Sequence, residues 1–242
     1  MPTRSPRCTR GWTSGKTSEH IVVTRAELIT RVVKPVLYVA AVLPLTWLLF
    51  ALLTGLVMGD EVKFMQHVTG DTALTCLMLS LTVTPLRRLT GWNELIKVRR
   101  MIGLTAFWYA CMHLSTYLVF DQSLSVDEIA RDIAKHPWVL VGFTAFLCLL
   151  PLAITSTKGW VRRLGGKRWQ RLHRLVYVGA FAGVLHYFWL VKKDIQLPLV
   201  YGAILLVLLG SRVWFSTRKG GHSKTAARVV PHAEPRASST SS

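Results

Sequence analysis

Three histidines lie within or at the ends of strongly apolar segments: His113, His173 and His186. Imidazole nitrogens are common metal ligands, and an ionisable side chain inside a membrane faces the protein interior, where it finds a partner. For a single histidine the simpler interpretation is a neutral ring hydrogen-bonded to a neighbouring helix, which contributes about 1 kcal/mol. Three histidines on two apolar segments, with no Asp or Glu expected inside the spans, favour a cofactor site instead.

The depths of these histidines separate them into two groups. His113 follows Met101 by 12 residues, a rise of ~18 Å in a helix, and His186 follows Leu172 by 14 residues, a rise of ~21 Å. Both segments are expected to run in the same direction, which puts the two imidazoles at one level. Two such rings can clamp a haem iron from both faces, and helical bundles commonly hold cofactors of this kind. The spacing predicts that His113 and His186 are axial ligands of one haem.

His173 precedes His186 by 13 residues, which places it ~20 Å away at the start of the same segment. At 100° per residue the two side chains point about 140° apart. The matching level of the other segment holds Arg99 and Arg100, which do not ligate iron. Two alternatives follow: His173 ligates a second haem with another partner, or it lines a flavin or quinone pocket. The intervening GAFAG supplies two glycines, either for close helix packing or to make room for a flat macrocycle.

The composition indicates a membrane protein. The 242 residues are 51% hydrophobic, with a mean hydropathy of +0.35, and yet carry a net charge of +18. The basic residues lie between apolar runs of about 20 residues rather than on one face of a folded module, which argues against nucleic-acid binding. The pattern predicts an all-α polytopic membrane protein with six transmembrane helices, at roughly 36-58, 72-86, 101-120, 138-157, 172-191 and 198-216.

The charges of the connecting segments predict the orientation. RRLTGWNELIKVRR and KGWVRRLGGKRWQR are strongly basic, whereas GDEVKFMQHVTGD and residues 121-137 are acidic or mixed. Because Lys and Arg are concentrated in cytoplasmic loops, both basic segments and both termini are expected on the cytoplasmic side. The chain then divides into a basic cytoplasmic N-terminal tail at 1-35, a six-span domain at 36-216 and a disordered basic C-terminal tail at 217-242.

Two long stretches resemble one known family: GWNELIKVRRMIGLTAFWYACMHLSTYLVFD and PLAITSTKGWVRRLGGKRWQRLHRLVYVGAFAGVLHYFWLVKKD. They are similar to the MsrQ (YedZ) family, the haem-binding membrane subunits of bacterial protein-methionine-sulfoxide reductases, within the larger group of ferric-reductase-like transmembrane domains. The resemblance covers about 36-216, and its most specific part is the LGG-x-x-W-x-x-LHRL-x-Y run followed by a second histidine. The family's haem-ligating histidines fall on His113, His173 and His186.

The resemblance implies a multi-pass cytochrome b of the bacterial inner membrane that binds haem b, one or two, and FMN. Electrons would pass from the quinone pool or a cytosolic flavin reductase to a periplasmic molybdopterin-dependent methionine sulfoxide reductase, MsrP, which repairs oxidised proteins. The chain would then be the electron-transfer subunit of an oxidoreductase complex rather than its catalytic subunit. Membrane lipid is the remaining expected partner.

Two other functions fit the sequence less well. A stand-alone ferric-reductase-like oxidoreductase needs a nicotinamide site, and the sequence has no G-x-G-x-x-G loop. A transporter or proton channel with histidine relays predicts acidic residues within the spans. The stand-alone oxidoreductase is kept as the alternative to the electron-transfer subunit.

Overall fold

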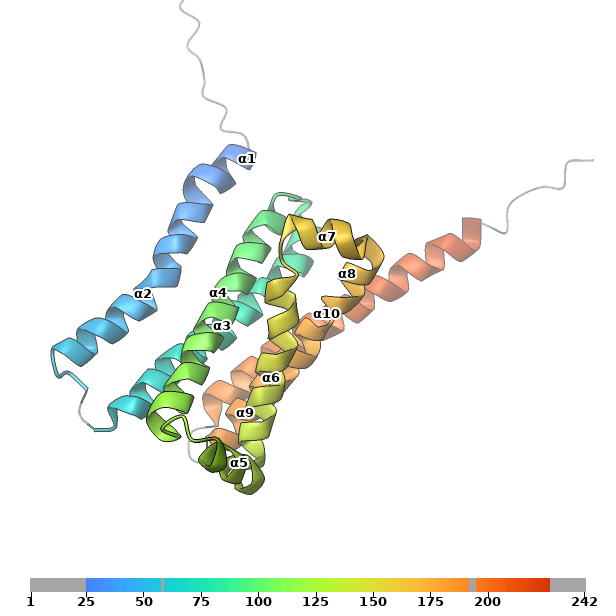
Figure 1. The fold of residues 1–242 in the computed structure, drawn as a ribbon. Coiled ribbons are helices and arrows are strands. Elements are labelled where there is room, and N and C mark those ends of the chain that lie inside the picture. The colour runs from blue at the N-terminus through green and yellow to red at the C-terminus, as the bar shows by residue number, and fades with distance from the viewer. Residues whose placement is uncertain (1–24, 58, 192–194, 227–242) are drawn as a thin grey trace, which may run out of the picture.

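The structure is a computed structural model that describes residues 25–57, 59–191 and 195–226. Every secondary-structure element in these ranges is helical (Figure 1). In chain order the elements are α1 (Arg25–Leu28), a π-helical turn (Ile29–Val33), α2 (Lys34–Leu53), α3 (Glu61–Thr90), α4 (Leu95–Thr116), a second π-helical turn (Tyr117–Asp121), α5 (Val126–Lys135), α6 (Pro137–Ile154), α7 (Lys158–Leu164), α8 (Gly166–Leu172), α9 (Leu175–Leu190) and α10 (Gln196–Ala226).

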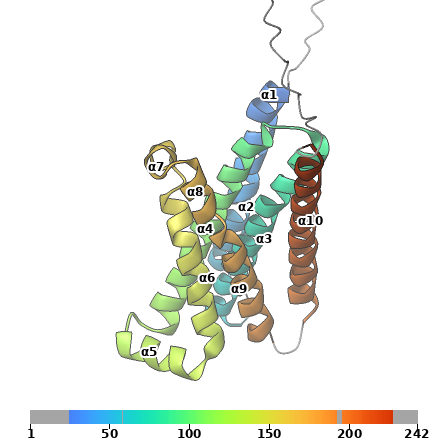
Figure 2. The same ribbon diagram turned by 90° about the vertical axis from the view of Figure 1, so that its right-hand side faces the viewer.

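The long helices α2, α3, α4, α6, α9 and α10 lie side by side as a bundle (Figure 1, Figure 2). The short helix α5 lies at one end of the bundle, and α7 and α8 lie at the other. These are called the α5 end and the α7–α8 end below. Helix α1 begins, and α10 ends, at the α7–α8 end (Figure 2). Helices α4 and α9 run in the same direction, from the α7–α8 end to the α5 end, as predicted for the segments that carry His113 and His186.

Within the described residues, four stretches are long and apolar enough to cross a membrane: Arg31–Leu53, Leu95–Asp121, Pro137–Ile154 and Gln196–Trp214. They correspond to the first, third, fourth and sixth predicted spans. Helix α9 has only 16 residues, ~24 Å, and α3 carries polar residues in its first half. The chain is thus a helical multi-pass membrane protein, and the crossing of the membrane by α3 and α9 stays a prediction.

Helix α3 corrects the second predicted span, 72-86. It is one continuous helix from Glu61 to Thr90, so most of the segment expected as an outward loop belongs to it. The Asp60 carboxylate accepts a hydrogen bond from the backbone N–H of Lys63 at 3.1 Å and fixes the start, and Gly91 (φ 71°) ends the helix. Polar residues concealed the helix because they interrupt the apolar pattern; of these, Gln66 and Asp71 are half-buried and Thr69 is buried.

Helical structure also extends into both segments predicted as tails, 1-35 and 217-242. Helix α1 begins at Arg25, and α10 continues to Ala226. The rest of each predicted tail lies outside the described residues. A helix that leaves a membrane can continue where its sequence turns polar, so the division into tails and a six-span domain stays a prediction.

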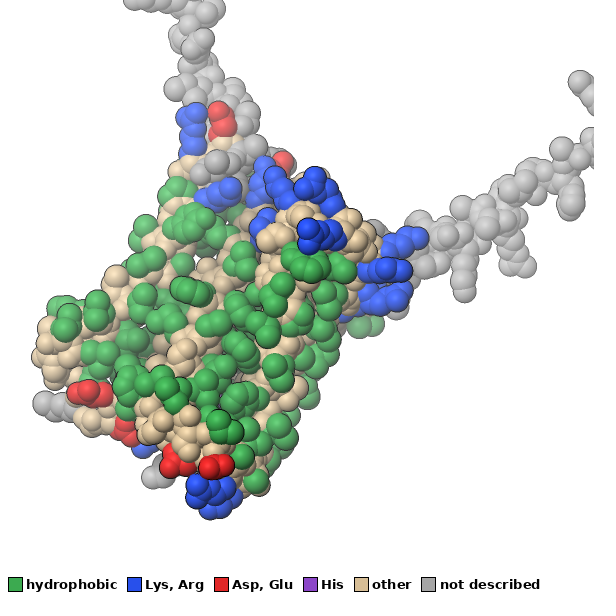
Figure 3. All heavy atoms as spheres, in the orientation of Figure 1, with side chains coloured by type: hydrophobic (Ala, Val, Ile, Leu, Met, Phe, Trp, Pro, Cys, Tyr) green, Lys and Arg blue, Asp and Glu red, His purple; other side chains and the backbone are tan. Residues whose placement is uncertain are grey.

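The outer surface of the bundle is apolar between two charged ends. Leu53 is 78% exposed and Leu206 is 72% exposed. Figure 3 shows a band of hydrophobic side chains between the α7–α8 end, where Lys and Arg gather, and the α5 end, where Asp and Glu lie beside Lys and Arg. A broad exposed apolar band is unfavourable in water and is the expected surface in lipid.

Candidate functional site

His113 and His186 face each other in the interior of the bundle, toward the α5 end. His113 lies on α4 and His186 on α9; their ring centroids are 6.2 Å apart and the ring planes are inclined by 79°. An imidazole nitrogen lies about 2 Å from a metal that it binds, so two rings on opposite sides of one metal have centroids roughly 6 Å apart. The pair has the separation expected of two axial ligands of one iron.

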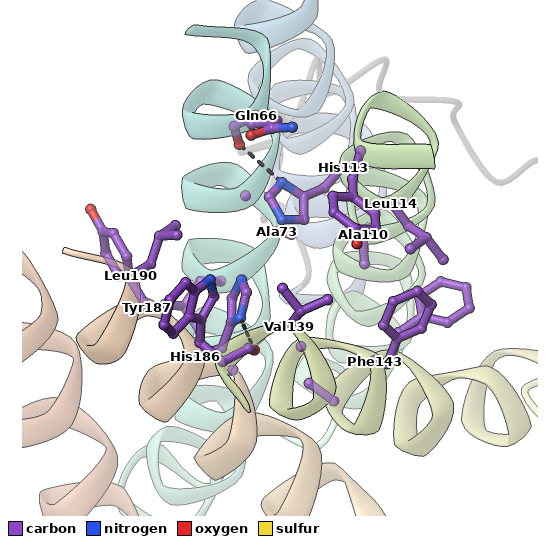
Figure 4. A pocket seen from close by; sticks show the side chains of 18 of the residues that line it. Gln66, Ala73, Ala110, His113, Leu114, Val139, Phe143, His186, Tyr187 and Leu190 are labelled. Carbon is purple, nitrogen blue, oxygen red and sulfur yellow. Dashed lines mark hydrogen bonds between the residues drawn. The ribbon is translucent and has the colours of Figure 1, made fainter. Parts of the chain in front are cut away.

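Each imidazole is oriented by a backbone carbonyl of a neighbouring helix. Nδ1 of His113 lies 3.0 Å from the carbonyl oxygen of Gln66 on α3, and Nδ1 of His186 lies 2.7 Å from that of Trp138 on α6 (Figure 4). Since a carbonyl oxygen only accepts, Nδ1 carries the proton in each ring and Nε2 keeps a free lone pair. Metal-binding histidines typically donate their second N–H in this way, and here Nε2 is left to bind the metal.

Glycines on α3 and α6 let the two rings reach these carbonyls. A Cβ atom at Gly70 would lie 3.1 Å from Cε1 and Nδ1 of His113, and one at Gly142 would lie 2.9 Å from the same atoms of His186. Each glycine follows the accepting residue by four positions, about one helical turn, so that neighbouring turns of one helix supply both the acceptor and the gap. The α3–α4 and α6–α9 pairs thus hold their imidazoles by the same arrangement.

The two rings border a cavity of about 460 Å³. Its inner part is lined by apolar or small residues, including Leu77, Ala145, Phe146, Leu149 and Gly179. Its part near α5 is lined by polar residues, including Gln66, His67, Asp121, Gln122, Asp132 and His136. The volume lies within the range of cofactor sites. The graded polarity suits a flat ligand with one apolar and one polar edge.

The side chains at this site fit a metal that is already coordinated by a cofactor better than they fit a bare metal ion. Within the described ranges, no group of three or more His, Cys, Asp or Glu side chains is placed to hold a bare metal ion. Two facing imidazoles complete the coordination of an iron that a macrocycle already holds in its plane, as in haem. The residues of this site therefore fit haem.

Two residues outside the predicted site, His67 and Asp71, also line the cavity. They lie one turn apart on α3, and Asp71 accepts a hydrogen bond from the hydroxyl of Tyr187, the neighbour of His186 in sequence. From the sequence, no Asp or Glu is expected inside the spans; Asp71 lies one residue before the predicted span 72-86, on the same helix α3, and borders the cavity of the two histidines. The available signal was the four-residue spacing of His67 and Asp71, which continues the helical register of the apolar residues after them.

Helix α5 borders the polar part of the cavity through a three-residue network. The Tyr117 hydroxyl donates to Oδ2 of Asp132 at 2.6 Å, and Nδ1 of His136 lies 2.7 Å from Oδ1 of the same carboxylate. Burial alone would raise the pKa of Asp132, but the hydrogen bonds from Tyr117 and His136 outweigh it, and the pKa lies below its ordinary value. The charged carboxylate therefore ties α5 to the end of α4.

His173 lies at the α7–α8 end, apart from this pair and outside the lining of the cavity. Its Nε2 is 3.2 Å from Oγ1 of Thr155, and that hydroxyl donates to the carbonyl oxygen of Pro151 at 2.6 Å. Nε2 of His173 is therefore the donor to Thr155. The ring also packs against Trp169, with centroids 3.9 Å apart. The structure brings together two of the three predicted ligands, and a ligand role for His173 stays a prediction.

Comparison with known proteins gives the class of membrane protein to which this helical bundle with facing histidines belongs. Residues 69–184 match the family described as ferric reductase like transmembrane component. The matched range contains His113 and His173 and ends two residues before His186. No solved structure matches the chain.

Individual relatives narrow the class. The chain is 48% identical over 197 residues to a protein of Herminiimonas arsenicoxydans, covering 81% of this chain and 90% of that protein. It is 47% identical over 190 residues to one of Azospira oryzae (78% and 82%) and 43% identical over 203 residues to one of Ralstonia nicotianae (83% and 94%). Each of these carries the name protein-methionine-sulfoxide reductase haem-binding subunit MsrQ. The chain belongs to this MsrQ family.

Proposed function

We propose that the chain is the membrane cytochrome b subunit of a methionine sulfoxide reductase system and passes electrons to a periplasmic MsrP-type enzyme. Its haem b would be held by Nε2 of His113 and Nε2 of His186. The observation that carries the proposal is the pair itself: 6.2 Å between ring centroids, with both Nδ1 atoms engaged by backbone carbonyls. The names of the relatives, which describe them as haem-binding, support it. Bound haem b supplies one-electron redox chemistry at a fixed depth.

The residues around the pair perform two tasks in this proposal. The carbonyl groups of Gln66 and Trp138 fix the tautomer of each imidazole and raise the basicity of Nε2. The apolar inner wall, which includes Leu77 and Leu149, excludes water from one side of the site. Second hydrogen bonds and solvent access are among the factors by which a protein sets a redox potential.

An optical spectrum of the purified chain tests the proposal. We expect the dithionite-reduced protein to show b-type absorption bands, and His113→Ala and His186→Ala each to lose them. His67→Gln is the matched control, because it removes an imidazole from the same cavity but outside the facing pair. Bands of undiminished intensity in both alanine variants would overturn the assignment of the ligands.

The wider arrangement belongs to the same proposal: six spans in the bacterial inner membrane, both termini cytoplasmic, and donation from the quinone pool or a cytosolic flavin reductase, with FMN as a further cofactor. The Lys and Arg gathered at the α7–α8 end, compared with the mixed charges of the α5 end, support this orientation (Figure 3). Cysteines placed at Asp127 on α5 and Arg163 on α7, in a chain without its own cysteines, test it. In spheroplasts a membrane-impermeant maleimide should label only the first, and the reverse pattern contradicts the orientation.

His173 is proposed to act at the cytoplasmic side, either on a second haem or in a flavin or quinone pocket. The position of His173 supports this proposal. His173 precedes His186 by 13 residues, about 20 Å along a helix, and lies on the side of the basic segments. The stand-alone oxidoreductase is the alternative function. It predicts that the purified chain reduces ferric chelates from a nicotinamide donor without any partner, whereas the electron-transfer subunit does not.

A further inference from the structure

Two guanidinium groups lie near one tyrosine at the α7–α8 end, apart from the paired histidines. Cζ of Arg212 on α10 is 4.6 Å from the ring centroid of Tyr177 on α9. Arg99 on α4 is partly buried and close enough to interact electrostatically with both Tyr177 and Arg212. Helices α4, α9 and α10 therefore bring two positive charges together.

The described part of the chain supplies no carboxylate to this pair: none forms an ion pair with Arg99 or Arg212. Two partly buried like charges repel each other, and an anion placed between them offsets the repulsion. The positive-inside rule accounts for the exposed arginines of α7 and α8, but it does not require arginines packed between helices. No residue of the described part of the chain therefore neutralises these two groups, and an anion from outside this part is expected to do so.

A small cavity opens beside Arg212, with a volume of about 10 Å³. It is lined by Leu81, Thr84, Pro85, Arg88, Tyr177, Leu208, Leu209, Ser211 and Arg212. A cavity of roughly this size holds one water-sized group, such as one oxygen of a larger anion. On the helices that form it, Leu89 is 74% exposed and Val207 is 70% exposed, so these helices present apolar surface to lipid.

We propose that Arg99 and Arg212, with Arg88 at the rim, bind the phosphate group of an acidic phospholipid. Guanidinium groups bind phosphate oxygens through paired, charge-assisted hydrogen bonds. Basic pockets between membrane helices on the cytoplasmic side are suited to anionic headgroups. A zwitterionic lipid carries its own cation beside the phosphate and binds less well. Free phosphate esters share the phosphate chemistry and are the other source of such a ligand.

Native mass spectrometry of the full chain, released from discs of equal parts phosphatidylglycerol and phosphatidylcholine, tests the proposal. We expect the wild type to retain phosphatidylglycerol preferentially, and Arg212→Gln and Arg99→Gln each to lower that retention about fivefold, the size expected for one basic residue at a membrane surface. Arg163→Gln is the matched control, because Arg163 also lies over an aromatic ring, 5.7 Å from the centroid of Trp160, but on α7. Arg212→Lys keeps the positive charge, so we expect this variant to retain most of the lipid. It provides the test if a glutamine variant fails to fold.

Inorganic phosphate and FMN, added to the detergent-purified chain, form the second arm. Binding of either compound that Arg212→Gln abolishes, together with lipid retention that does not depend on Arg212, assigns the site to free phosphate groups and overturns the lipid assignment. Equal retention of both lipids by the wild type, with no binding of phosphate or FMN that depends on Arg212, overturns the phosphate site itself.

Discussion

The two ends of the bundle hold their histidines in opposite ways. Toward the α5 end, His113 and His186 donate Nδ1–H to backbone carbonyls and keep Nε2 free. At the α7–α8 end, Nε2 of His173 is itself the donor, to Thr155, and Trp169 packs on the ring. Backbone carbonyls on rigid helices set the position of a ligand before the metal arrives, whereas a histidine whose Nε2 is already bonded must give up that bond in order to ligate through Nε2.

The two ends of the bundle also differ in the sign of the charges near their histidines. The large cavity near α5 has Asp71, Asp121 and Asp132 in its lining and, among the described residues, no Lys or Arg. At the other end, Arg99 interacts electrostatically with His173 and with Arg212. Acidic groups near a haem stabilise its oxidised, more positive state, while clustered guanidinium groups attract anions. These charges agree with the two proposals, iron at the α5 end and an anionic ligand at the α7–α8 end.

The largest expected effect comes from filling the gaps that admit the two rings. Gly142→Ala places a Cβ 2.9 Å from His186, closer than real contacts allow, so the ring must shift and its bond to Trp138 must lengthen. We expect haem affinity to fall about 10- to 100-fold, the range for loss of a second hydrogen bond on a metal ligand. Gly70→Ala, with its contact at 3.1 Å, should have the same effect to a smaller degree. Titration of the haem-free protein with haem, followed optically, measures both.

Gly183→Ala is the control for this experiment. Gly183 lies on α9 and lines the same cavity, but a Cβ there would meet only Cδ1 of Leu74, at an ordinary contact distance of 3.5 Å. Its haem affinity should stay near that of the wild type. If all three alanine variants bind haem equally well, the glycines do not position the imidazoles and the comparison between the two ends loses its main support.

Much of this site could be predicted from the sequence, because helical rise converts residue counts into depth. The counts to His113 and His186 placed both rings at one level, and the structure brings them within 6.2 Å. Gly70 and Gly142 could not be found in this way. Their role depends on which carbonyl each ring reaches on a neighbouring helix, and a single sequence does not show how helices are rotated against one another.

The polar half of α3 was missed for a different reason. Hydropathy assumes that apolar residues face lipid and polar residues face water, whereas the half-buried Asp71 lines the cavity between the helices. The glycines of GAFAG had two interpretations, and the structure contains features of both. A Cβ at Gly179 would lie 3.3 Å from Cβ of Cys148 on α6, which indicates close packing, and Gly179 and Gly183 both border the cavity.

A smaller effect is expected at the other end, where His173→Ala sharpens the comparison. The variant loses the bond to Thr155 and the contact with Trp169, which together should lower the free energy of unfolding by about 1–2 kcal/mol. The optical bands that depend on His113 and His186 should persist, while reduction by a flavin or quinone donor should slow. Thr155→Val removes the hydroxyl that pairs with His173 and with the Pro151 carbonyl but leaves the contact with Trp169, and it should lower stability by about 1 kcal/mol. Loss of the main haem bands in His173→Ala would show that the two ends are not separable.

The smallest expected effect concerns the carboxylate that ties α5 to the cavity. Because the pKa of Asp132 is lower in the folded chain than its ordinary value of 3.8, the charged carboxylate stabilises the fold above that pH, and the contribution is lost as pH falls through the lowered pKa. Tyr117→Phe removes one of the two hydrogen bonds and should lower the free energy of unfolding by about 1 kcal/mol at pH 7, with a smaller difference from the wild type at pH 3. Thermal unfolding of both proteins in detergent, measured across this range, checks the sign. A difference that grows as the pH falls would mean that Tyr117 stabilises the protonated carboxyl group, and the network near the haem site would then not depend on a charged Asp132.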